Sequence, residues 1–173
     1  LISGRRSYKV GPTFEALAQY LLTAGLGYEC LAWDLQIFEA KRTVGALDLV
    51  LRSTTGAVEH WELAYKLYLH DGVGLSSEHW VGPNEHDRLR RKVDRLLNHQ
   101  LPLSSRAEAE SALQKIGVER IDSKRILLLG LLFHHWRQSP QRAEGAMADS
   151  FGVWVHIGDL PAYLAAHSKC HFS

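Results

Sequence analysis

The sequence has 173 residues, of which 46% are hydrophobic and 23% are charged, and its formal net charge is +1. These values are typical of one soluble globular domain with a sizeable core, and the net charge by itself indicates no particular partner. Two cysteines, Cys30 and Cys170, exclude a disulfide framework and indicate a reduced, cytoplasmic setting, and no apolar run approaches the roughly 18 residues of a membrane-spanning helix. Because the chain begins at Leu1 without methionine, we expect a piece of a longer protein, with residues 1–10 as a loosely held lead-in.

The first predicted element is a helix. Apolar residues from 14 to 22 follow helical spacing, with Thr13 as a candidate N-cap and Gly25 or Gly27 as the end of the run. Glu15 lies beside the apolar stripe, where a solvated position is the simplest interpretation.

Three strands are expected next. Residues 28–38 alternate between apolar and polar, and two apolar runs rich in β-formers follow at 45–51 and 60–69. A Ser-Thr-Thr-Gly cluster at 53–56 predicts the turn between the two runs.

The two apolar runs carry charged residues in their interiors, Asp48 in the first and Glu62 and Lys66 in the second. Ionised side chains inside apolar strands are costly unless they are paired or bind a metal. Because residues two apart in a strand share a face, Glu62, Ala64 and Lys66 point the same way. Two carboxylates and an amine beside a small residue predict a metal and phosphate site. The alternative is a partly buried ion pair of Glu62 with Lys66 that holds no metal.

A second helix is predicted from Asn84, as N-cap, to about Gln100, where Pro102 stops it. A basic stripe occupies one of its faces at spacings i, i+4, i+7 and i+11, and consists of Arg88, Lys92, Arg95 and His99. The stripe is either a solvated charged face or a phosphate-contacting surface. Gln100 continues the apolar face instead, so we expect it to point inward toward the central strands.

The remaining chain predicts a minor helix at 104–117, a buried strand at 125–133, a short strand at 151–157 and a closing helix at 160–166. No repeat or second domain is visible. The sequence therefore predicts a single mixed α/β domain.

This order of elements resembles the restriction-endonuclease-like, or PD-(D/E)XK, nuclease superfamily, whose core is a helix, a three-strand meander, a helix and a strand. The short extra strand and the C-terminal helix would be additions to that core. The matching residues are Glu15 in Phe-Glu-Ala-Leu, Asp48 in Gly-Ala-Leu-Asp-Leu-Val, and Glu62 with Lys66 in Trp-Glu-Leu-Ala-Tyr-Lys. The superfamily places its lysine two residues after the acid, where this chain has Ala64. Lys66 lies two residues further along the same strand face, and its long stem makes the reach feasible.

The chain also resembles a narrower bacterial family, the domain of unknown function DUF1853, over most of residues 11–166. The strings that carry this resemblance are His-Trp-Glu-Leu-Ala-Tyr-Lys-Leu-Tyr-Leu, Trp-Val-Gly-Pro-Asn and Leu-Leu-Asn-His-Gln-Leu-Pro-Leu. It implies a family without an activity.

The nuclease resemblance implies metal-dependent hydrolysis of nucleic acid, DNA ahead of RNA. Carboxylates would hold Mg²⁺ or Mn²⁺, the metal would activate a water, and Lys66 would neutralise charge on the phosphate. The residues expected to act in catalysis are Glu15, Asp48, Glu62, Lys66 and Gln100, of which Glu15, Asp48 and Glu62 would bind the metal. The residues expected to bind nucleic acid are Arg88, Lys92, Arg95 and His99.

The main alternative is an inactive module of the same fold that binds nucleic acid or a protein partner, which Ala64 in the usual lysine position favours. The ten histidines show no zinc-ligand spacing such as His-Glu-x-x-His. A Gly-x-Ser-x-Gly nucleophile elbow and a phosphate-loop fingerprint are also absent from the sequence.

Overall fold

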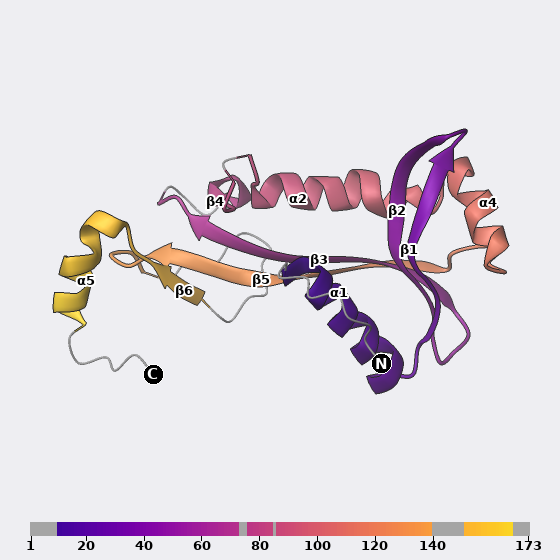
Figure 1. Cartoon of the computed structure of the whole chain (residues 1–173), viewed down its shortest axis with the longest axis horizontal. Helices are drawn as coiled ribbons and strands as arrows, with labels where there is room; N and C mark the ends of the chain where they lie inside the picture. Colours follow the sequence, from indigo (N-terminus) through magenta and orange to yellow (C-terminus); the bar gives the residue numbers. More distant parts are fainter. Residues whose placement is uncertain (1–9, 73–75, 85, 140–150, 168–173) are drawn as a thin grey trace. The chain divides into compact units, whose positions relative to one another are not determined.

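The structure is a computed structural model, and it describes residues 10–72, 76–84, 86–139 and 151–167 (Figure 1). The predicted lead-in therefore lies outside the described residues, apart from Val10. Contacts divide the chain into two compact units: unit 1 extends to Lys66 and includes Val93–Leu129, and unit 2 comprises Leu67–Lys92 and the chain from Gly130 onward. Among the described residues, no helix has both the length and the apolar character needed to cross a membrane.

Unit 1 begins with the predicted helix, α1 (Val10–Tyr20), which continues into the π-helical turn η1 (Leu21–Gly25). Thr13 lies inside α1 instead of capping it, because the helix starts earlier and Pro12 is accommodated in the first turn, where its missing N–H is not needed. The predicted end is confirmed: η1 stops at Gly25, and Gly27 has a φ of +74°, which favours glycine.

The three predicted strands are confirmed as β1 (Glu29–Glu39), β2 (Arg42–Arg52) and β3 (Val58–His70). Consecutive strands pair antiparallel, and the predicted turn is closed by Gly56 N–H donating to the Ser53 carbonyl at 2.9 Å. The ladder between β2 and β3 runs from Arg52 opposite Val58 to Leu49 opposite Trp61. Asp48 is therefore the first residue of β2 beyond the paired stretch.

The second predicted helix consists of α2 (Leu89–Arg95), the π-helical turn η3 (Leu96–Gln100) and α3 (Leu101–Leu103), and α4 (Ala107–Lys115) follows. The predicted start was wrong, because Asn84 opens a turn in which the Asp87 N–H donates to its carbonyl at 2.8 Å. The predicted stop was also wrong, since helical structure continues through Pro102. A proline ring clashes with the carbonyl four residues earlier, and the wider turn of η3 directly before Pro102 accommodates it.

The last predicted elements are confirmed with shifted ends, as β5 (Ser123–His135), β6 (Phe151–Trp154) and α5 (Leu160–Ala166), with η4 (Ile157–Asp159) before α5. The sequence pattern does not predict η2 (Ser77–His79) or β4 (Trp80–Val81), because two strand residues give no alternation. The six-stranded, mostly antiparallel sheet has the order β1-β2-β3-β5-β6, with β4 paired to β3 and β6 parallel to β5. The fold is therefore mixed α/β, as predicted.

Unit 1 buries apolar side chains in two clusters. The α1 cluster consists of Ala18, Leu22, Leu49, Leu51 and Leu63, and the α4 cluster of Ile37, Leu47, Val50, Leu103, Ala109, Leu113 and Val118. Because side chains alternate along a strand, Leu63 and Glu62 lie on opposite faces of β3. Helix α1 therefore packs on the face of β3 opposite to Glu62.

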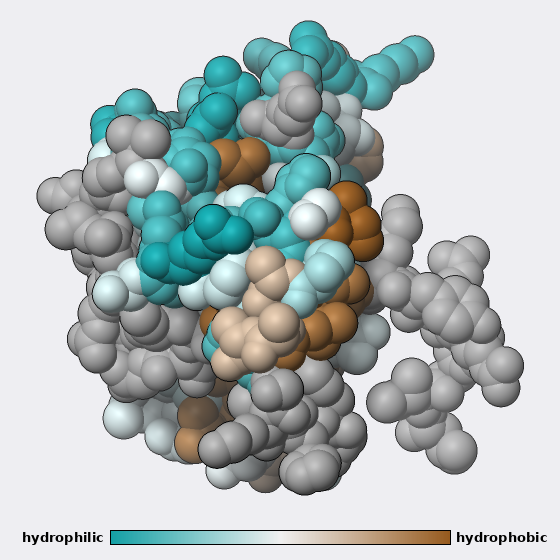
Figure 2. Space-filling view, turned by 90° about the vertical axis from the view of Figure 1, so that its left-hand side faces the viewer, coloured by the Kyte–Doolittle hydropathy of each residue, from teal (hydrophilic) through white to brown (hydrophobic). Residues whose placement is uncertain are grey.

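Unit 2 has a core of aromatic rings. The rings of His70, Trp80 and His134 are almost fully buried, with centroids 4.9–5.8 Å apart. Burial, together with the neighbouring His70, lowers the pKa of His134. A Cβ at Gly152 would lie 2.3 Å from the Phe133 ring, so the pairing of β6 with β5 requires glycine there. On the face drawn in Figure 2, hydrophobic side chains (brown) reach the surface among hydrophilic ones (teal).

A buried carboxylate links β3 to β5 within unit 1. Glu59 is 4% exposed and accepts hydrogen bonds from Arg125 Nε at 2.7 Å, Arg125 Nη2 at 3.0 Å and Trp61 Nε1 at 2.9 Å. The Arg125 hydrogen bond holds the pKa of Glu59 below its ordinary value of 4.5, although burial acts in the opposite direction. The pair therefore contributes stability that is fully present above the ordinary pKa and is lost as the pH falls through the lowered one.

Replacing Glu59 by glutamine is expected to lower the free energy of unfolding at pH 7 by about 1 kcal/mol, a modest value because water reaches the half-exposed Arg125. The loss should shrink as the pH is lowered from 7 to 3, because the native carboxyl takes up protons as the pH approaches its lowered pKa. Urea titrations at both pH values measure it, with Glu29→Gln, in an exposed pair with Arg52, as the control. An equal loss at both pH values would contradict a role for the ionised carboxylate.

Candidate functional site

Asp48 and Glu62 lie at neighbouring positions of adjacent strands. The Asp48 Oδ2 accepts a hydrogen bond of 2.7 Å from the N–H of Leu63, the residue that follows Glu62. This N–H lies just beyond the paired stretch of β2 and β3, so the carboxylate replaces the backbone acceptor that the ladder no longer supplies. The two residues of the predicted site therefore occupy neighbouring strand positions, and Asp48 has a structural role at this point.

Glu62 is the centre of a buried hydrogen-bond network. Its side chain has no exposed surface, its Oε1 lies 2.8 Å from His60 Nε2, and its Oε2 accepts from Gln100 Nε2 of η3. The other ring nitrogen of His60, Nδ1, lies 3.0 Å from the Ser104 hydroxyl. The predicted inward orientation of Gln100 is confirmed.

Sequence reasoning missed His60 and Ser104. His60 could have been found, because it lies two residues before Glu62 on the same strand face. Ser104 gives no such signal, since it lies 44 residues from His60 along the chain and is brought to it by the end of α3.

Lys66 and Glu15 are both partly buried. By strand alternation Lys66 shares the Glu62 face, with the buried Ala64 between them. Glu15 belongs to α1, which contacts the other face of β3 through Phe14 and Tyr65, whose ring centroids are 5.6 Å apart. The expected contributions of both residues to catalysis stay predictions.

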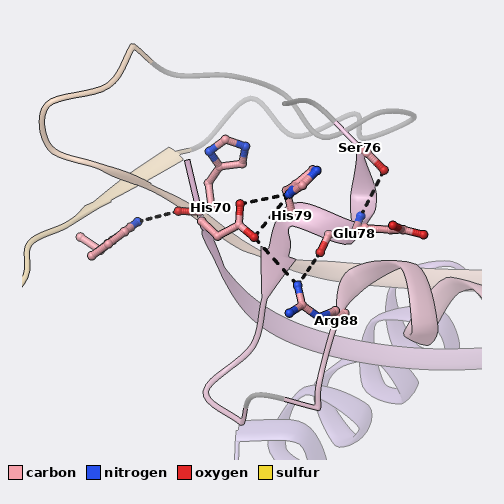
Figure 3. Close-up of polar contacts among 7 residues, drawn as sticks. His70, Ser76, Glu78, His79 and Arg88 are labelled. Carbon is pink, nitrogen blue, oxygen red and sulfur yellow. Dashed lines mark hydrogen bonds and ion pairs between the residues drawn. The ribbon is translucent and has the colours of Figure 1, made fainter. Parts of the chain in front are cut away.

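The basic stripe is divided between the units: Arg88 and Lys92 belong to unit 2, and Arg95 and His99 to unit 1. His99 lies in η3, where the π-helical turn interrupts the spacing on which the stripe was predicted. Arg88 Nη1 donates to the Glu78 carbonyl at 2.8 Å and lies 3.9 Å from Asp71 Oδ2 (Figure 3). Arg88 is therefore held in a polar cluster of unit 2.

The family model described as "Domain of unknown function (DUF1853)" matches residues 1–172. The chain belongs to this family. No curated protein and no solved structure matches the chain. Membership of DUF1853 thus confirms the narrower resemblance and names no activity.

In this DUF1853 chain, Ser104, His60 and Glu62 are connected in the order of a hydrolase triad. A nucleophile has to reach its substrate, however, and the most exposed of the three, Ser104, is only 7% exposed. The network therefore orients buried side chains and satisfies their polar atoms, which costs less than leaving them unpaired.

The same network decides whether this DUF1853 site fits a catalytic metal. Asp48 and Glu62 offer the hard oxygen ligands that Mg²⁺ and Mn²⁺ prefer, but each Glu62 oxygen already holds a hydrogen bond in a position closed to solvent. Mg²⁺ usually keeps several of its waters, for which a fully buried carboxylate leaves no room. Within the described ranges, no group of three or more His, Cys, Asp or Glu side chains is arranged to hold an ion. In this arrangement the donors do not fit a hydrated divalent metal.

Proposed function

We propose that this chain is a nuclease-like module that binds nucleic acid without cleaving it. The observation that carries the proposal is the state of Glu62, which is fully buried and hydrogen-bonded through both oxygens to His60 and Gln100. The order of elements, with a helix, a three-strand meander, further helices and β5 beside β3, supports a restriction-endonuclease-like core. The fold would then serve binding, and hydrogen bonds to His60 and Gln100 would occupy the carboxylate of Glu62 that binds the metal in active members of the superfamily.

The surface proposed to contact nucleic acid is the basic segment of unit 2, defined as Arg88, Arg90, Arg91 and Lys92. No acidic residue interrupts it in the sequence, and Arg90 and Arg91 have exposed side chains. Contacts of Lys and Arg with phosphates supply most of the sequence-independent affinity for nucleic acid and make it depend on salt. The proposal therefore predicts binding that weakens steadily as salt is added.

Fluorescence anisotropy with labelled single- and double-stranded DNA and RNA, over a series of KCl concentrations, tests this prediction. We expect a linear fall of log K with log salt, and Arg90→Ala should weaken binding to all sequences and reduce the slope by about one. Arg42→Ala, which removes an exposed arginine at the start of β2, is the matched control and should bind like the unmodified chain. Binding that does not respond to salt, or an equal loss in both variants, would exclude this surface.

Metal-dependent hydrolysis is the second candidate function, favoured by the neighbouring positions of Asp48 and Glu62. It requires Glu62 to give up its hydrogen bond with His60 or with Gln100, so that the freed carboxylate oxygen can bind the metal. Incubating the same oligonucleotides with Mg²⁺ or Mn²⁺ distinguishes the two functions on a denaturing gel. We expect intact strands; product that disappears in Asp48→Asn would establish hydrolysis instead.

A further inference from the structure

A second polar site lies entirely within unit 2. It is a pocket of about 460 Å³, and its lining residues are Asp71, Glu78, His79, Arg88, Arg90 and Arg91. Its volume is within the range of about 300–1,000 Å³ that is usual for small-ligand sites. The pocket is distinct from the buried Glu62 network, all of whose members belong to unit 1.

The backbone around the pocket is fixed by hydrogen bonds. Asp71 N–H donates to the His79 carbonyl at 2.9 Å, and His79 N–H donates to the Ser76 carbonyl at 3.0 Å. The Ser76 hydroxyl also accepts from the Glu78 N–H at 3.4 Å, which caps η2 (Figure 3). The side chains that line the pocket therefore start from a constrained framework, which lowers the entropic cost of binding.

Asp71 contacts two of the side chains that line the pocket, His79 and Arg88. Its oxygens lie 3.2 and 3.4 Å from His79 Nδ1, so the carboxylate holds a proton on this nitrogen and leaves Nε2 for another partner. Arg88 is fixed between Asp71 and the Glu78 carbonyl, as Figure 3 shows. These contacts use only some of the five N–H donors of its guanidinium group. Both side chains are thus held in place before a ligand arrives.

The charges of the pocket favour an anion with several oxygens. Three arginines outnumber the two carboxylates of Asp71 and Glu78. Guanidinium groups bind phosphate through paired hydrogen bonds, which are stronger than bonds between neutral groups. A phosphate monoester carries a charge of about −1.5 to −2 at pH 7, more than the single charge of a phosphate inside a nucleic-acid strand.

We propose that this pocket binds a phosphate monoester, supplied by the phosphorylated end of a nucleic-acid strand. The inference rests on the proposed function, since it names the part of the nucleic acid that the module recognises. A concave site receives a terminal group, whereas phosphates inside the strand contact the open part of the basic segment. Arg88, Arg90 and Arg91 contact the phosphate oxygens, and Asp71 acts as a positioning residue for Arg88.

Competition binding by the full chain tests the inference with three oligonucleotides of one sequence: 5′-phosphorylated, 3′-phosphorylated and unphosphorylated. We expect one phosphorylated form to bind roughly tenfold more tightly than the unphosphorylated one. Arg90→Gln and Arg91→Gln should abolish this ratio. Lys92→Gln, which does not line the pocket, should weaken all three oligonucleotides and leave the ratio unchanged.

The outcomes separate this inference from the proposed function. Equal binding of all three oligonucleotides would overturn the terminal-phosphate inference and leave general nucleic-acid binding intact. If no oligonucleotide binds, the proposed function fails. Calorimetry with a nucleoside monophosphate and with inorganic phosphate then shows whether the pocket binds a free phosphate. Heat of binding that is lost in Arg91→Gln would support a monoester site for a free ligand, and the absence of heat would overturn it.

Discussion

Replacing Glu62 by alanine is expected to lower the free energy of unfolding by about 3 kcal/mol. The substitution leaves the Nε2 atoms of His60 and Gln100 without their carboxylate partner, and it opens a cavity where the fully buried side chain was. Urea titration measures the change through the midpoint, with an unaltered slope as the sign that the native state keeps its compactness. Glu39→Ala, at the exposed end of β1, is the matched control and should change stability by less than about 0.5 kcal/mol.

The sign of this effect separates a structural network from a catalytic one. Residues kept for catalysis often cost stability, so removing a catalytic carboxylate that is repelled by Asp48 would stabilise the chain. An increase in stability for Glu62→Ala would therefore contradict the closed site and favour hydrolysis. Glu62→Gln refines the comparison, because it keeps the shape and one acceptor and should cost less than Glu62→Ala.

The strands and most helices were predictable because their signals are local. Alternation, turn residues and β-forming composition are read within a few positions, and they predicted β1, β2 and β3 to within three residues. The inward orientation of Gln100 was predictable for the same reason, since it continues an apolar helical face. Helical structure through Pro102 was not, because the π-helical turn that accommodates the proline has no signature in the sequence.

The candidate site was predicted less completely, because its chemistry depends on contacts distant along the chain. Burying a charged side chain in an apolar strand costs free energy, and Asp48 and Glu62 were identified as unusual positions for that reason. How those costs are offset, by the Leu63 N–H, His60 and Gln100, depends on the register of β2 and β3 and on the packing of η3. Similarly, spacing alone placed Arg88 in a basic stripe, and only the fold reveals its contacts with Asp71 and Glu78.

Leu49→Ala is expected to lower the free energy of unfolding by about 2–5 kcal/mol, the range for truncating a fully buried leucine. Leu49 directly follows Asp48 in β2 and is the residue at which the pairing with β3 ends. It belongs to the α1 cluster with Ala18 and Leu22. Its loss should therefore loosen α1 from the sheet and reduce protection of the α1 amides in hydrogen exchange. Leu17→Ala, on the exposed side of the same helix, should cost less than about 0.5 kcal/mol. A loss below about 1 kcal/mol for Leu49→Ala, with α1 amides still protected, would show that α1 does not depend on this contact.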